Sequence, residues 1–260
     1  MKTILEKTRA INRLLQTSAG KPVNFMEIAS VLRDNINSNV YIIGRRGHIL
    51  GAAFMADFVC PGMDEILKQR DFPGSFNLDM LAITQTSSNI LDKTRGCFFQ
   101  LEDFTCPFEY KVVSVVPILG GGERLGTLVL GKLGGEFTDG DLVLAEYGAT
   151  VVAMEILRAK TEKVEEEARR RAAVQVALGT LSYSEREAVE HIFAELEGNE
   201  GLLVASKIAD RVGITRSVIV SALRKFESAG VIESKSLGMK GTFIRVLNEN
   251  LLDELRPEKS

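Results

Sequence analysis

The side chains with the clearest chemical potential lie between positions 205 and 246, where basic residues gather. This stretch holds eight basic and three acidic residues, a net charge of +5 in a chain whose formal charge is −3. Positive charge concentrated on one module is what contact with a nucleic-acid backbone requires. The local excess therefore indicates a DNA partner despite the mildly acidic average. The alternative is an ordinary packed unit with solvated charges.

The spacing of residues within 205–224 predicts a helix-turn-helix. Ala209 is small enough to let a second helix approach, and Gly213 can adopt the left-handed turn conformation that a Cβ penalises. Thr215 is the expected cap of the second helix. The apolar residues spaced to fill the angle between the helices are Ile208, Val212, Ile214, Ile219 and Leu223.

The start of the second helix is the expected reading surface. In such motifs this end enters the major groove, and Arg216 can donate two hydrogen bonds to guanine. A strand at 231–234, a loop at 235–241 and a return strand at 242–246 predict a wing whose lysines meet phosphate. The expected DNA contacts are Ser206, Lys207, Thr215, Arg216, Ser217, Ser221, Arg224, Lys235, Ser236 and Lys240.

The sequence does not indicate a catalytic site, a metal site or a phosphate-binding loop. The two histidines, His48 and His191, lie far apart, so no catalytic triad is indicated. Cys60, Cys97 and Cys106 lack the spacing of a zinc site or a disulfide framework and are expected to be free thiols. The glycine-rich 120–126 segment lacks the Gly-Lys-Ser/Thr of a phosphate loop, which favours a hairpin turn. We therefore expect no enzyme, no metal site and no cofactor other than an effector.

The elements before this module predict an α+β domain. An antiparallel sheet with helices on one face is expected, the organisation of GAF-type sensor domains. Asn24 is the expected cap of the second helix. The predicted helices are 3–18, 25–36 and 63–70, and the predicted strands are 39–43, 48–51, 97–101, 112–119 and 127–133, with residues 45–47 as the turn of the first hairpin.

A long helix is expected to connect the two domains. Thr138 caps it, and helical spacing continues without proline from residue 142 to 178 through a charged block at 160–171. A coiled-coil seam between two copies is the alternative. Ser184 and Glu187 predict a capping box for the following helix. The predicted domains are a sensor at 1–137, a linker helix at 138–180 and a winged helix-turn-helix at 181–260.

Length and composition suit this organisation. The chain has 260 residues, of which 45% are hydrophobic and 26% charged, typical of a soluble protein with two folded domains. The N-terminus does not resemble a signal peptide, and no stretch approaches the ~20 apolar residues of a membrane span. We expect a cytoplasmic protein that does not contact a membrane.

Several segments together resemble the CodY family. They are residues 20–25, 120–127, 144–152, 205–220 and 227–242. The resemblance covers nearly the whole chain, is most specific from about residue 115 onward and weakens between about 52 and 110. It implies a nutrient-sensing global repressor of nutrient and stationary-phase genes with a GAF domain, a linker helix and a winged helix-turn-helix. It also implies a homodimer, with a tetramer left open.

The resemblance implies two effector sites. The GTP site matches Arg45, Arg46, His48, Glu155 and Lys160, and two adjacent arginines can hold a triphosphate. Glu155 can accept a hydrogen bond from guanine, and His48 stands where the family more often has lysine.

The second implied site takes branched-chain amino acids: isoleucine, leucine or valine. Met63, Phe72 and Phe99 match its apolar positions. Gly62 stands where members with an isoleucine site carry the arginine that holds the carboxylate. Arg70 or Arg95 could substitute. Control by GTP, by these amino acids or by both is implied, and the departure at Gly62 leaves amino-acid sensing open.

The leading hypothesis is a dimeric DNA-binding repressor in which the sensor sets the geometry of two winged helices. Such a switch requires an effector that binds one arrangement better than the other. The alternative is a nucleotide-binding sensor whose output is a protein–protein contact, with the helix-turn-helix serving assembly. DNA binding separates the two.

Overall fold

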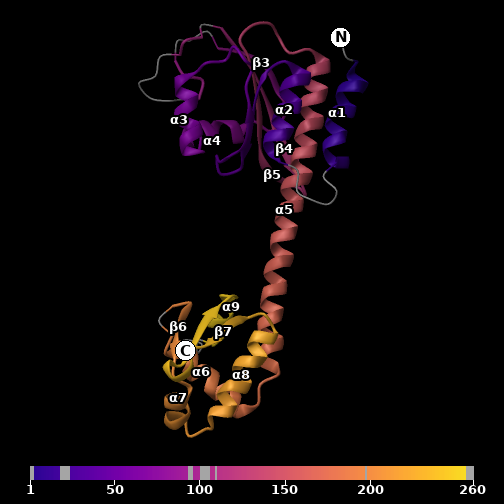
Figure 1. Cartoon of the computed structure of the whole chain (residues 1–260). Coiled ribbons are helices and arrows are strands. Elements are labelled where there is room, and N and C mark those ends of the chain that lie inside the picture. Colours follow the sequence, from indigo (N-terminus) through magenta and orange to yellow (C-terminus); the bar gives the residue numbers. More distant parts are fainter. Residues whose placement is uncertain are drawn as a thin grey trace. The chain divides into compact units, whose positions relative to one another are not determined.

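The chain folds into two compact units, Met1–Thr161 and Glu162–Ser260, in the computed structural model shown in Figure 1. The structure describes residues 3–17, 24–92, 96–99, 106–108, 110–196 and 198–255. One helix, α5 (Asp139–Gly179), begins in the first unit and ends in the second. The predicted long helix is therefore confirmed. Its N-terminus is capped reciprocally, because Asp141 N donates to Thr138 Oγ1 and Thr138 N donates to Asp141 Oδ2.

The first unit is built on a five-stranded antiparallel sheet with the order β2-β1-β5-β4-β3. Its strands are β1 (Asn39–Gly44), β2 (Ile49–Ala53), β3 (Ser87–Asp92), β4 (Lys111–Gly120) and β5 (Glu123–Lys132). The central strands β4 and β5 are buried over continuous runs rather than at alternate positions. Both faces of the sheet are therefore covered.

Helices cover the two faces (Figure 1). The helices α1 (Ile4–Thr17), α2 (Phe25–Ile36) and the first part of α5 pack on one face, where Val40 and Ile42 point. The helices α3 (Pro61–Gln69) and α4 (Gly74–Ala82) pack on the other, where Tyr41 and Ile43 point. The expectation of helices on one face only was wrong, because the continuous apolar runs of the central strands need cover on both sides.

Local signals predicted some elements well and others poorly. The α2 bounds match the prediction, and Met26 N donates to Asn24 Oδ1 at 2.9 Å. The α4 helix and the β3 strand were not predicted; α4 begins at Gly74, directly after Pro73. The strand expected at 97–101 was wrong, because described residues 97–99 are not in a strand.

The glycine-rich segment after β4 forms a tight hairpin. Gly121 and Gly122 both adopt positive φ, +60° and +79°, which suits a two-residue turn between antiparallel strands. The predicted hairpin is confirmed, and β5 begins at Glu123, earlier than expected.

The second unit combines the end of α5 with a three-stranded sheet of order β6-β8-β7. Its other elements are α6 (Tyr183–Ala194), β6 (Glu200–Leu203), α7 (Ala205–Val212), α8 (Arg216–Ser228), β7 (Ile232–Ser236), the 3₁₀ turn η1 (Gly238–Lys240), β8 (Thr242–Val246) and α9 (Asn250–Leu255). The predicted wing is confirmed as β7, η1 and β8. Phe226 lies fully buried in this core and packs against Phe193. The elements β6 and α9 were not predicted.

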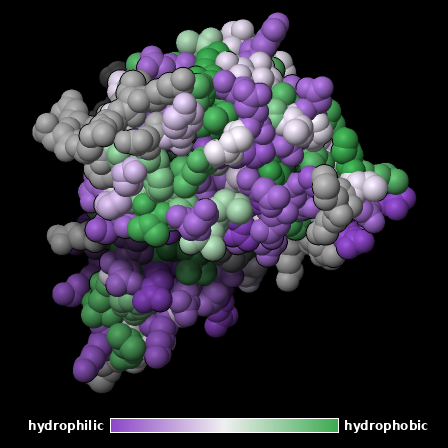
Figure 2. Space-filling view, turned by 90° about the horizontal axis from the view of Figure 1, so that it is seen from above, coloured by the Kyte–Doolittle hydropathy of each residue, from purple (hydrophilic) through white to green (hydrophobic). Residues whose placement is uncertain are grey.

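Figure 2 shows hydrophilic and hydrophobic side chains interspersed over one face rather than gathered into one apolar area. The described residues contain no helix long and apolar enough to cross a membrane.

Candidate DNA interface and effector sites

The corner between α7 and α8 has the expected geometry. Gly213 ends α7 with a φ of +76°, and its N–H donates to Ala209 O. Ala209 and Ile219 are buried in the angle between the helices. Any other residue at position 213 would be strained in this left-handed conformation. The glycine therefore fixes the direction in which α8 leaves the turn.

The first turn of α8 presents polar side chains to solvent. Thr215 occupies the N-cap position, but its hydroxyl does not cap the helix and instead lies 2.7 Å from Ser217 Oγ. Arg216 and Arg224 are exposed on the same helix. This face of α8, together with Val176 on α5 and Thr180 directly after α5, lines an open groove of about 960 Å³.

A buried carboxylate holds α8 against α6. Glu185 Oε2 accepts from Lys225 Nζ at 2.6 Å and from Ser182 N at 2.7 Å, and Glu185 Oε1 accepts from Ser221 Oγ at 2.7 Å. Burial raises the pKa of this carboxyl, but the hydrogen bonds from Lys225, Ser182 and Ser221 outweigh it and lower the pKa to about 2. Lys225 Nζ also donates to Thr180 O at 2.8 Å, which ties α8 to the residue that follows α5.

These contacts correct the prediction of a capping box from Ser184 and Glu187. The capping box is formed by Ser182 and Glu185. The sequence contains two overlapping Ser-x-x-Glu patterns, and burial of Glu185 selects the first. Ser221, an expected DNA contact, is half-buried and donates to Glu185, so its role at DNA stays a prediction.

The eight basic residues of 205–246 divide into two groups. Three have acidic partners: Arg211 with Glu195, Lys225 with Glu185, and Arg245 with Glu200. Within the described part of the chain, the other five are exposed and have no ion-pair partner. They are Lys207, Arg216, Arg224, Lys235 and Lys240. All five belong to the predicted DNA contacts, as do the exposed Ser206 on α7 and Ser236 on the wing.

The predicted nucleotide residues approach one end of the sensor sheet. Arg45 and Arg46 are exposed in the turn between β1 and β2, and across the described residues neither guanidinium has an ion-pair partner. Arg45 N donates to Leu125 O at 3.0 Å, and Asn77 Nδ2 donates to Arg45 O at 3.1 Å. Asn77 thus ties the turn of Arg45 and Arg46 to α4, while the backbone N–H of Arg45 ties the same turn to β5. Asn77 was not predicted, because it lies 32 residues further along the chain.

Of the α5 residues of this set, Lys160 lies beside the β4–β5 hairpin. Lys160 Nζ is 3.6 Å from Glu123 Oε2 at the start of β5. The arginine turn and the β4–β5 hairpin share one end of the sheet, since Gly44 pairs with Gly126. Glu155 is buried, with only 6% of its surface exposed.

The side chain of His48 contacts Asp71. Its Nδ1 contacts Asp71 Oδ1, and the two residues form a short bridge between the arginine turn and the segment after α3. In this structure the His48 side chain therefore supports that turn through Asp71, a partner that sequence spacing did not indicate.

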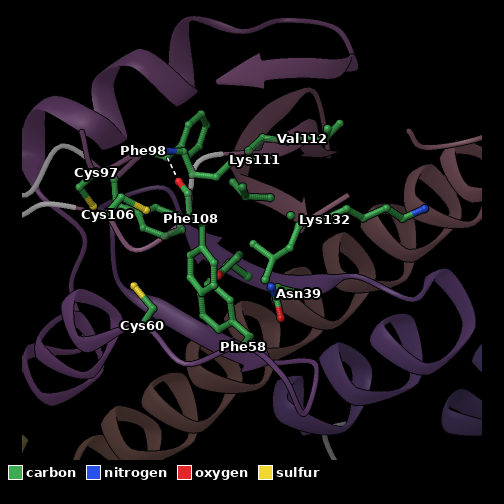
Figure 3. A pocket seen from close by; sticks show the side chains of 16 residues that line it. Asn39, Phe58, Cys60, Cys97, Phe98, Cys106, Phe108, Lys111, Val112 and Lys132 are labelled. Carbon is green, nitrogen blue, oxygen red and sulfur yellow. Dashed lines mark hydrogen bonds between the residues drawn. The ribbon is translucent and has the colours of Figure 1, made fainter. Parts of the chain in front are cut away.

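An apolar cavity of about 50 Å³ lies on the α3 and α4 face of the sheet (Figure 3). Phe99 lines it, while Met63 and Phe72 are buried in the surrounding aromatic cluster. The three predicted apolar positions thus share one core, but only Phe99 reaches the cavity. Arg70 is exposed at the end of α3 and does not line the cavity, and Arg95 lies outside the described residues.

The two amines that line the cavity are already paired. Lys111 Nζ lies 3.4 Å from Asp92 Oδ2 and donates to Gly96 O and Phe108 O. Lys132 Nζ donates to Asp141 Oδ2 at 2.9 Å. Each cation is therefore neutralised by the protein's own carboxylate.

A sheet domain of this architecture, joined through a long helix to a winged helix-turn-helix, defines a class of DNA-binding transcription regulators. The comparison with family models agrees. A model described as "CodY GAF-like domain" matches residues 3–180, and one described as "CodY helix-turn-helix domain" matches residues 199–259. The chain belongs to the CodY family and is a DNA-binding transcriptional regulator with an N-terminal GAF-type domain. The expected fold class and family are confirmed.

Two curated relatives match the chain over its full length. The chain is 58% identical to the global transcriptional regulator CodY of Bacillus pumilus (strain SAFR-032), covering 99% of both proteins. It is 57% identical to the same-named protein of Clostridium botulinum (strain Hall), covering 100% of both. A solved cofactor-binding GAF domain of the nutrient sensor CodY from Clostridium difficile is 41% identical, covers 60% of this chain and 99% of that chain, and has a TM-score of 0.41.

Proposed function

We propose that this regulator is a repressor that reads DNA through the first turn of α8 and the wing, and that GTP controls it. The proposal of DNA binding is supported by the division of the basic residues of 205–246 into paired and unpaired groups. Five exposed cations without ion-pair partners among the described residues lie on α7, α8 and the wing, while three others serve internal ion pairs. Unpaired surface cations are available to replace the counterions of a phosphate backbone.

The nucleotide part rests on the arginine turn. Two adjacent guanidinium groups, unpaired within the described chain, suit the bidentate hydrogen bonds that phosphate oxygens accept. Asn77 and Leu125 fix the backbone of Arg45, so little order would be lost on binding. Lys160 and Glu155 on α5 supply further polar groups near this end of the sheet.

Calorimetry with GTP tests this site. Arg45→Ala or Arg46→Ala removes a charge-assisted pair of about 2 kcal/mol and weakens binding roughly 30-fold. Arg9→Ala, an exposed arginine on α1, is the matched control and leaves the affinity unchanged. Equal affinity for GTP in all three variants would show that the turn of Arg45 and Arg46 does not bind GTP.

We further propose that the apolar cavity does not bind an amino acid through its carboxylate. Gly62 is buried at the start of α3 and offers no side chain, and Lys111 and Lys132 are paired with Asp92 and Asp141. Seating a carboxylate there would require breaking one of those pairs or leaving a charge buried without a partner. Isothermal titration with isoleucine and with valine should give no heat of binding. Micromolar affinity for either would overturn this part.

We also propose a homodimer paired along α5. Its large exposed apolar side chains are Val143, Met154, Val164 and Val176. At about 100° per residue these four fall on one face of the helix. A second copy of the chain would cover that face. Sedimentation equilibrium should give a dimer in the wild type and a shift toward monomer in Met154→Lys. A monomeric wild-type protein at micromolar concentration would contradict this assignment.

A further inference from the structure

The three cysteines of the chain share one cavity that neither DNA binding nor the nucleotide site uses. Cys60, Cys97 and Cys106 all line the apolar cavity, although they come from three separate places in the sequence. Cys60 is buried, and the other two are half-buried. Figure 3 shows the three side chains on one side of the cavity, opposite Val112 and Lys132. Spacing alone indicated unrelated free thiols, but the fold brings them together.

The three thiols line one small cavity, and the other two thiols form part of the electrostatic surroundings of Cys60. Burial raises the pKa of Cys60, the backbone N–H groups of Met63 and Gly62 oppose this, and the charges of Cys106 and then Cys97 raise it further. Of the two neighbours, Cys106 has the larger effect. The described residues hold no cluster of three ligand side chains able to bind a metal ion. The thiols that line this cavity therefore suit chemistry between two sulfurs.

We propose that this cavity is an oxidation site, in which Cys106 and Cys60 form an internal disulfide when the protein meets a hydroperoxide. The half-buried Cys106 sulfur attacks the peroxide oxygen, the O–O bond breaks, and an alcohol leaves with the thiol proton, which produces a sulfenic acid. The Cys60 sulfur then attacks the Cys106 sulfur. The S–S bond forms, the S–O bond breaks, and water leaves with the second thiol proton. Together the two thiols lose two electrons, and the hydroperoxide accepts them and becomes an alcohol and water.

The site makes the reaction selective rather than fast. The raised pKa of Cys60 keeps its thiolate population low at neutral pH, so the second step is slow unless the sulfenic acid is already beside it. The aromatic side chains of Tyr41, Phe58 and Phe108 line the same cavity and limit the access of larger thiols. The internal partner is therefore favoured over a mixed disulfide. The bond would link the N-terminus of α3 to residue 106 on that side of the cavity.

The full-length protein, treated with hydrogen peroxide and then with an alkylating agent, tests the proposal by intact mass and peptide mapping. The expected product has lost two hydrogens, has one alkylatable thiol left, and contains a Cys60–Cys106 link that a phosphine reverses. Cys97→Ser and Cys106→Ser are a matched pair of half-buried substitutions. The first should keep the link and the second should abolish it, and thermal unfolding of both variants confirms that they fold.

Three results would overturn the inference. One is a link that persists in Cys106→Ser or disappears in Cys97→Ser. Another is oxidation to sulfinic acid without any cross-link. The third is a disulfide between two copies of the chain in place of the internal one. None of these readouts depends on GTP or DNA, so the inference and the proposed function can fail separately.

Discussion

The DNA-reading unit and the sensor cavity use their basic residues in opposite ways. In the winged helix, Lys207, Arg216 and Lys235 are exposed and, among described residues, have no acidic partner. At the cavity, Lys111 and Lys132 are held by Asp92 and Asp141. Exposed unpaired charge is available to a polyanion, whereas paired charge serves the fold. In these two regions the role of a basic side chain therefore depends on whether an acidic side chain pairs with it.

The largest effect is expected from a large-to-small substitution in the core of the second unit, Glu162–Ser260. Phe226 is fully buried against Phe193, so Phe226→Ala should lower the free energy of unfolding of this unit by about 4 kcal/mol. Amide hydrogen exchange on the full chain should show faster opening in α6 and α8. Exchange in β4 and β5 should not change, because they belong to the other compact unit. Equal acceleration in both units would show that they unfold together, which contradicts this prediction.

Removing the charge of Glu185 should have the next largest effect. Glu185→Gln leaves Lys225 without its carboxylate partner and should cost about 2 kcal/mol, measured from exchange of α8 amides. Glu187→Gln, a half-buried carboxylate on the same helix, is the control and should leave exchange nearly unchanged.

The carboxylate of Glu185 should make the stability of this unit depend on pH. Its folded pKa of about 2 lies below the ordinary value of 4.5, so the unfolded chain binds the proton more readily. The stabilisation is therefore fully present above pH 4.5 and is lost as the pH falls from 4.5 toward 2. The difference between wild type and Glu185→Gln should be constant at neutral pH and shrink below pH 4.5. A difference that persists at pH 2.5 would show that the carboxylate acts by packing rather than by charge.

Arg216 should carry sequence-specific recognition. Arg216→Ala is expected to weaken binding to a selected DNA site by about 2 kcal/mol, roughly 30-fold, and to relax preference at one base pair. Competition binding with single-base variants of the site measures both effects. Arg186→Ala on α6, whose partner is Glu190, is the matched control and should not alter the base preference. Unchanged specificity in Arg216→Ala would mean that another residue reads the base.

The smallest effect is expected on the wing. Lys235→Ala should lower affinity similarly for all DNA sequences and reduce the slope of log affinity against log salt by about 1. Lys163→Ala, in the exposed charged block of α5, serves as the control for net charge. A sequence-dependent loss in Lys235→Ala would place the wing among the base readers rather than on the backbone.

How much the sequence predicts depends on the distance over which each signal acts. Gly213, Ala209 and the basic residues lie within one short stretch, so local spacing was enough to place the helix-turn-helix. The residues that hold these sites in place are more distant in the sequence. Asn77 bonds to Arg45, 32 residues away, and Lys225 bonds to Glu185, 40 residues away. No periodicity reports such pairs, and the two overlapping capping patterns near Ser182 could be separated only by burial. The cavity was the least predictable part, because its lining comes from strands β1, β4 and β5 and from the separate segments 58–60, 97–99 and 106–108.

The most direct test of the account is the affinity of the full-length protein for a selected DNA site, measured at one salt concentration with and without GTP. Wild type and the Arg45→Ala/Arg46→Ala double variant are compared, with Arg9→Ala as the control. The account predicts that GTP strengthens DNA binding by the wild type and by Arg9→Ala and has no effect on the double variant. The same response to GTP in all three proteins, or no response in the wild type, would contradict it.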